Sequence, residues 1–160
     1  MYSKILLTLD DSDVAQQAIP HALSLARHTG AALVLLTVID SEAQMIMQAS
    51  GATIEPIAVG QVSAEIAHES VVAQHAEAQA RLDATRRVLE AEGVRDVTTV
   101  VREGQPGHEI VAAVEELGCD VVVMASHGRS GIKRAILGSV ADHVARHVRG
   151  ASVLLVSTKE

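Results

Sequence analysis

The sequence DVVVMASHGRSGIKRAILGS, at residues 120–139, decides the fold class. Its four consecutive apolar residues, 121–124, are typical of a strand buried on both faces of a parallel sheet. A loop of small and polar residues follows, and Gly138 and Ser139 then begin a helical pattern. Glycines allow close approach of the backbone, and a helix N-terminus favours negative charge, so this stretch predicts a loop that binds a phosphate-bearing ligand.

Apolar runs elsewhere in the chain predict four more strands, and apolar residues at helical spacing predict helices between them. Pro20, inside the first helical pattern, predicts a kink or an irregular first turn. We therefore expect one α/β domain over residues 1–160, a doubly wound, Rossmann-like parallel sheet with helices on both faces. The predicted strands are residues 5–9, 33–38, 96–102, 121–124 and 152–157, and the predicted helices are residues 11–29, 62–92, 106–117 and 139–148.

Residues 41–61 lose helical and strand periodicity and contain glycines and a proline. The length of this connection is unusual for a compact domain. Because Met45, Ile46 and Met47 are apolar and few charges lie near them, we expect the segment to pack over the mouth of a ligand site or against a partner.

Composition limits the class of protein. Lysine and arginine number 13 against 20 aspartates and glutamates, giving a net charge of −7, so binding to nucleic acid or to an anionic membrane is not expected. Cys119 is the only cysteine, which excludes an intrachain disulfide and is typical of a reducing compartment. The apolar run at residues 5–7 is too short for a signal peptide or a membrane span, so we expect a cytoplasmic protein.

Residues suited to ligand binding follow two of the predicted strands. Asp10 and Asp11 follow the first strand, and Gly128 follows the fourth. If these strands are neighbours where the strand order reverses, both ends face one crevice. Each feature has a simpler interpretation, since the aspartates can cap a helix and the glycine can serve a turn. The residues alone leave both interpretations open.

Three stretches resemble the universal stress protein family: KILLTLDDSD at residues 4–13, EGQPGHEI at 103–110, and residues 120–156. ATP-binding members of that family carry the motif G-x2-G-x9-G-[ST] after the fourth strand. Gly128, Gly138 and Ser139 match its second part, whereas Ala125 stands in place of the first glycine. The resemblance implies a sheet of order 3-2-1-4-5 and an ATP site.

The resemblance also implies roles for individual residues. Asp10 would lie near the ribose and triphosphate, and could hold Mg²⁺ or Mn²⁺ through the phosphates. The Val38 backbone would meet adenine, and Met124 and Ala125 would flank the ribose. Thr8 and Leu9 occupy adjoining positions, where the family often has Pro-Thr. The residues implied to lie near the phosphates are His127, Gly128, Arg129, Gly138, Ser139 and Val140.

The function implied is a nucleotide-binding regulatory module of the stress response, with at most slow ATP hydrolysis. The chain has no P-loop and no nucleophile elbow, so no catalytic residue is predicted. A dimeric interaction protein that binds no nucleotide is the alternative, and an adenylyl-transferring enzyme is a third candidate. Family members commonly form homodimers through the fifth strand, and residues 152–157 form an apolar strand expected at the sheet edge.

Overall fold

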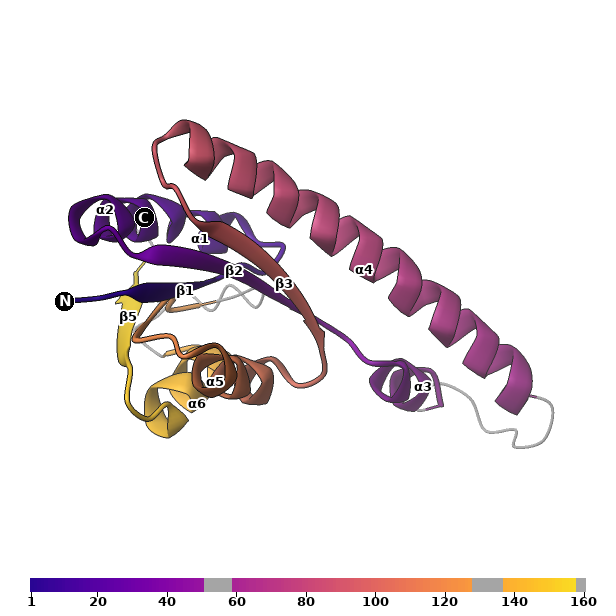
Figure 1. Ribbon diagram of the computed structural model, residues 1–160. Coiled ribbons are helices and arrows are strands. Elements are labelled where there is room, and N and C mark those ends of the chain that lie inside the picture. The colour runs from indigo at the N-terminus through magenta and orange to yellow at the C-terminus, as the bar shows by residue number, and fades with distance from the viewer. Residues whose placement is uncertain (51–58, 128–136, 158–160) are drawn as a thin grey trace.

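The computed structural model describes residues 1–50, 59–127 and 137–157. Its five strands form one parallel sheet of order β3-β2-β1-β4-β5 (Figure 1), which confirms the predicted order. The strands are β1 (Lys4–Thr8), β2 (Ala32–Ile39), β3 (Val97–Glu103), β4 (Val121–Ala125) and β5 (Ser152–Val156). The helices are α1 (Asp13–Gln16), α2 (Ile19–Thr29), α3 (Glu42–Ser50), α4 (Val59–Ala91), α5 (Pro106–Leu117) and α6 (Ser139–His147).

Both faces of the sheet are covered, because successive residues of a strand point to opposite faces. Ile5 and Leu7 of β1 pack in a cluster with α2 and α4, and both are fully buried. Leu6 points the other way, into a cluster with α5 and α6. The buried positions of β1 and β4 are therefore apolar, and aliphatic side chains form the core on both faces.

The first predicted helix is two helices in the structure. Ser12 caps α1 by accepting a hydrogen bond from the Ala15 N–H. Pro20 lies in the first turn of α2, the part of a helix where the missing proline N–H costs no hydrogen bond. The expected kink is thus a complete break, and Gly30 ends α2 in a left-handed conformation with φ of 73°.

The prediction of an irregular segment at residues 41–61 is wrong over the part that the structure describes, because α3 begins there. Ser41 and Gln44 form a reciprocal cap: the Ser41 N–H donates to Gln44 Oε1 (2.8 Å) and the Gln44 N–H donates to Ser41 Oγ (3.4 Å). Met45 packs on Ile39 and Val71. Figure 1 shows α3 and the adjoining end of α4 extending beyond the sheet.

Asp120 ties the amino end of β1 to the start of β4. Its carboxylate accepts hydrogen bonds from the Ser3 N–H (2.7 Å), the Ser3 hydroxyl (2.6 Å) and the Lys4 N–H (3.2 Å). Burial by itself would raise the pKa of this carboxyl, but these hydrogen bonds lower it on balance. The neighbouring Cys119 is buried, and burial raises the pKa of its thiol, as expected for a packing residue.

Asp120→Ala is expected to lower the free energy of unfolding by about 1–2 kcal/mol, because three hydrogen bonds to one carboxylate are lost. Since the folded-state pKa of Asp120 is lowered, its contribution is present above the unfolded pKa and is lost as pH falls through the folded pKa. Urea denaturation at neutral and acidic pH measures both effects. The matched control is Asp96→Ala, at an exposed position; a loss of stability as large in the control would contradict the assignment.

Candidate functional site

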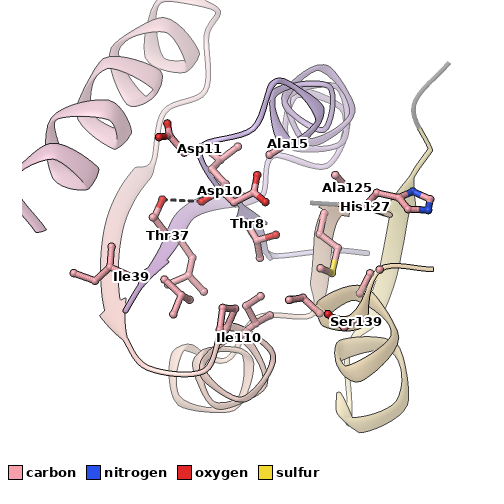
Figure 2. A pocket seen from close by; sticks show the side chains of 18 of the residues that line it. Thr8, Asp10, Asp11, Ala15, Thr37, Ile39, Ile110, Ala125, His127 and Ser139 are labelled. Carbon is pink, nitrogen blue, oxygen red and sulfur yellow. Dashed lines mark hydrogen bonds between the residues drawn. The ribbon is translucent and has the colours of Figure 1, made fainter. Parts of the chain in front are cut away.

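The carboxyl ends of β1, β2 and β4 open into one cavity of about 540 Å³, a size typical of small-molecule sites. β1 lies between β2 and β4, so the strand order reverses at the β1–β4 pair, as expected for a ligand crevice. Figure 2 shows Asp10, Thr37, Ile110 and Ser139 arranged around this space. All predicted site residues that the structure describes line it: Thr8, Leu9, Asp10, Val38, Met124, Ala125, His127, Gly138, Ser139 and Val140. Gly128 and Arg129 lie outside the described residues.

Asp10 lies where the chain leaves β1. Its Oδ1 accepts hydrogen bonds from the Ser12 N–H (3.2 Å) and from the Ser12 hydroxyl. Ser12, rather than Asp10, is the N-cap of α1. Asp10 therefore holds the N-cap residue Ser12 by hydrogen bonds and also lines the cavity. A structural role at the helix start and a role in ligand binding are thus compatible for this residue.

The position of Ala125 at the first motif glycine costs no backbone strain. No non-glycine residue in the described ranges has a positive φ, and Ala125 continues β4 in extended conformation. The next residue keeps this geometry, since the Ser126 N–H donates to the Val156 carbonyl (2.8 Å). Alanine therefore fits here without the conformational freedom of glycine.

The N-terminus of α6 faces the cavity without a side-chain cap. Gly138 is the N-cap, with φ of −60° and ψ of 150°, and makes no side-chain capping hydrogen bond. Its own N–H donates to the Ser126 carbonyl (2.9 Å), so this donor is already used within the protein. The first-turn N–H groups of Ser139, Val140 and Ala141 have no acceptor within the helix, and all three residues line the cavity.

Three cavity residues from α4 were not predicted from the sequence: Gln74, Glu77 and Arg81. Their spacing of i, i+3 and i+7 places them on one helix face. That spacing is visible in the sequence, but the side of the helix that meets the strand ends depends on how α4 crosses the sheet. By contrast, none of the described lining residues comes from α3, so the expectation that residues 41–61 cover the ligand mouth is not supported for α3.

A histidine contact joins the two helices on the other side of the cavity. The His143 ring lies 4.5 Å from the His108 ring and stacks on His147 at 4.1 Å, between centroids. A Cβ at Gly107 would lie 2.9 Å from the His143 ring, so glycine permits this close packing of α5 on α6. Partial burial lowers the pKa of His143, and the two neighbouring imidazoles lower it further.

Within residues 1–50, 59–127 and 137–157, no group of three or more His, Cys, Asp and Glu side chains could hold a metal ion. Over the same ranges, no helix combines the length and the apolar character that crossing a membrane requires.

The fold and the site define an α/β protein with a ligand cavity at the switch point of a parallel sheet and a helix N-terminus open to that cavity. The chain belongs to the Universal stress protein family, whose profile matches residues 1–157.

Curated relatives have the same family identity. The universal stress protein MJ0531 of Methanocaldococcus jannaschii is 30% identical over 147 residues, which cover 92% of this chain and 78% of that protein. The universal stress protein MJ0577 of the same organism is 28% identical over 159 residues, covering 99% and 97%. The solved structure of MJ0577 has a TM-score of 0.80 at 29% identity, covering 100% of this chain and 99% of that one.

Two more distant solved structures contain adenine nucleotides. A universal stress protein in complex with cAMP has a TM-score of 0.66 at 23% identity, covering 99% of this chain and 98% of that one. The universal stress protein from Archaeoglobus fulgidus in complex with dAMP has a TM-score of 0.63 at 18% identity, covering 96% and 97%. Both share the fold of this chain.

Proposed function

We propose that this protein binds an adenine nucleotide, and specifically ATP, as a cytoplasmic regulatory module of the stress response. The observation that carries the proposal is the N-terminus of α6, which lacks a side-chain cap and opens into a cavity of about 540 Å³. Unpaired N–H groups and the helix dipole together favour phosphate there. Relatives solved with cAMP and dAMP support an adenine nucleotide as the ligand class.

The proposed orientation places the phosphates against Ser139 and Val140 and near His127, and Gly128 and Arg129 are proposed as further phosphate contacts. Gly138 then acts by leaving space for the ligand, since its N–H already binds Ser126. The ribose lies between Asp10 and the end of β4, where Met124 and Ala125 line the cavity. Adenine meets the backbone at Val38, beyond Thr8 and Leu9.

A divalent cation is proposed to enter with the nucleotide. Asp10 supplies one carboxylate at the cavity, and triphosphate oxygens supply further oxygen ligands of the kind that Mg²⁺ and Mn²⁺ prefer. We propose binding with slow hydrolysis at most, because the chain lacks the sequence motifs of P-loop enzymes and of hydrolases with a nucleophile elbow.

Calorimetric titration of the purified protein with ATP, GTP and inorganic triphosphate, each with excess Mg²⁺, tests the function. ATP is expected to bind, GTP to bind more weakly because backbone contacts at Val38 suit adenine, and triphosphate to bind weakest because it lacks base and ribose. If none of the three gives heat at millimolar concentration, the alternative of an interaction protein without nucleotide is supported instead. Equal affinity for ATP and triphosphate would contradict the base and ribose contacts.

We also propose a homodimer formed through β5. This strand is an edge of the sheet, and Leu154 keeps 36% of its surface exposed. An apolar edge strand exposes hydrogen-bonding groups that a second copy of the same strand can satisfy.

A further inference from the structure

Helix α4 forms one wall of the cavity, and buried side chains anchor this helix on the sheet. Ala78 and Leu82 of this helix are 0% and 2% exposed and anchor it on the sheet. Arg81 lies between these two anchoring residues in the sequence, and it lines the cavity at the strand ends. This wall lies outside the glycine motif that the family resemblance covers.

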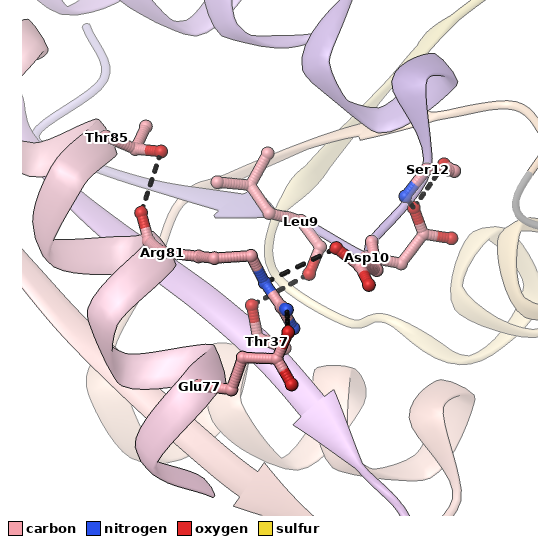
Figure 3. Close-up of polar contacts among 8 residues, drawn as sticks. Leu9, Asp10, Ser12, Thr37, Glu77, Arg81 and Thr85 are labelled. Carbon is pink, nitrogen blue, oxygen red and sulfur yellow. Dashed lines mark hydrogen bonds and ion pairs between the residues drawn. The ribbon is translucent and has the colours of Figure 1, made fainter. Parts of the chain in front are cut away.

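Arg81 joins α4 to the loop after β1. Its Nη1 lies 2.7 Å from Glu77 Oε1 (Figure 3). Its Nε lies 3.4 Å from Asp11 Oδ1. The same loop is held from β2, since the Thr37 hydroxyl donates to the Leu9 carbonyl (2.9 Å). The Arg81 and Asp11 side chains are 40% and 50% exposed, and pairs this exposed add little to stability.

The charges around the cavity indicate that Arg81 affects the binding of a charged ligand rather than the stability of the fold. The described lining contains four carboxylates, those of Asp10, Asp11, Asp40 and Glu77. Arg81 is the only lysine or arginine among the described lining residues. Charges lining a cleft with low-dielectric walls act strongly on a bound ion. Without Arg81, this lining would repel a polyanionic ligand more strongly with each added phosphate.

We propose that Arg81 is a specificity-determining residue that allows the cavity to accept polyphosphorylated nucleotides. It does so by offsetting the carboxylates of Asp11 and Glu77, so its effect grows with the charge of the ligand. This inference rests on the proposed function, because it concerns which adenine nucleotides the same site takes.

The experiment measures Kd for ATP, ADP, AMP and adenosine at constant Mg²⁺ in the protein and in Arg81→Gln. The variant is expected to weaken ATP binding by about tenfold and AMP binding by about twofold, and to leave adenosine unchanged. Arg81→Lys keeps the charge and is expected to stay within about threefold of the unmodified protein for ATP. The differences should shrink at high salt, since the lining is partly exposed.

Arg87→Gln is the matched control, because it removes the same charge from an exposed position of α4 outside the described lining; it is expected to change none of the four affinities. Asp11→Asn tests the opposite sign and is expected to tighten ATP while leaving adenosine unchanged. The Asp11→Asn variant also tests the proposal if Arg81→Gln does not fold.

The inference is overturned if Arg81→Gln weakens the binding of all four ligands equally, or if it does not weaken ATP binding. It is also overturned if Asp11→Asn leaves the affinity for ATP unchanged or lowers it. If the unmodified protein binds none of the four ligands, the proposed function fails instead, so the two failures are distinguishable.

Discussion

Gly138→Val is expected to reduce ATP affinity by about a hundredfold or more, a loss of roughly 2.7 kcal/mol or greater in binding free energy. Gly138 is the N-cap of α6, immediately before the first-turn N–H groups at the cavity. A branched side chain there would occupy the space through which a phosphate approaches those donors. Because φ is −60° and ψ is 150°, valine can adopt the backbone conformation, so the fold should be retained.

Calorimetric titration with ATP, after circular dichroism has confirmed the fold, measures this effect. Gly138→Ala should show an intermediate loss, since its side chain is smaller. Ala145→Val adds a branched side chain to an exposed position of the same helix and is the matched control, with unchanged affinity expected. An unaltered Kd in Gly138→Val would mean that phosphate does not bind at the α6 N-terminus.

The strands were predictable because each central strand is buried on both faces. Residues 121–124 are apolar throughout for the physical reason that Val121 and Val123 pack toward one layer of helices and Val122 toward the other. The order of the strands has no comparable local signal. It came from the family resemblance, and the positions of Asp10 and Ala125 at one cavity follow from that order.

Helix α3 was missed although the sequence carries a signal for it. Ser41 followed by Gln44 is the pattern of a capping box, and their reciprocal hydrogen bonds begin the helix. The prediction for residues 41–61 rested on the lost periodicity and on the glycines and the proline, and it did not use that pattern. A terminal motif of four residues is thus more informative about where a helix begins than the average composition of the segment.

The parts of the site that sequence could not predict depend on contacts between distant segments. The Gly138 N–H donates to the carbonyl of Ser126, twelve residues earlier in the sequence. Arg81 reaches Asp11 across seventy residues of sequence, because α4 packs over β2 and β3. Neither contact has a spacing that a motif could encode.

Val153→Pro is expected to convert the proposed β5 homodimer to a monomer. The Ser152 N–H donates to the Asp120 carbonyl, and the Val156 carbonyl accepts from the Ser126 N–H, so both residues bond toward β4. Backbone groups alternate in direction along a parallel strand, which directs the N–H groups of Val153 and Leu155 to the outer edge. Proline at Val153 removes an outward donor while it leaves the β4–β5 ladder in place.

The register changes the choice of residue for this test. Leu154 is the most exposed apolar residue of β5 and the natural choice from sequence, but its N–H points toward β4. Leu154→Pro would therefore weaken the fold itself, and a monomer obtained with it would not report on the interface. Val153→Ala is the better control, because it shortens the side chain and keeps the donor, and it is expected to remain dimeric.

Sedimentation equilibrium at micromolar concentration compares the unmodified protein, Val153→Ala and Val153→Pro. A dimer is expected for the first two and a monomer for the third, with thermal unfolding of all three recorded to show that each is folded. If the unmodified protein is monomeric, the β5 interface is not formed. If Val153→Pro stays dimeric, the two copies associate through another surface. Pairing of two β5 strands needs the outward N–H of residue 153, and proline removes that hydrogen-bond donor.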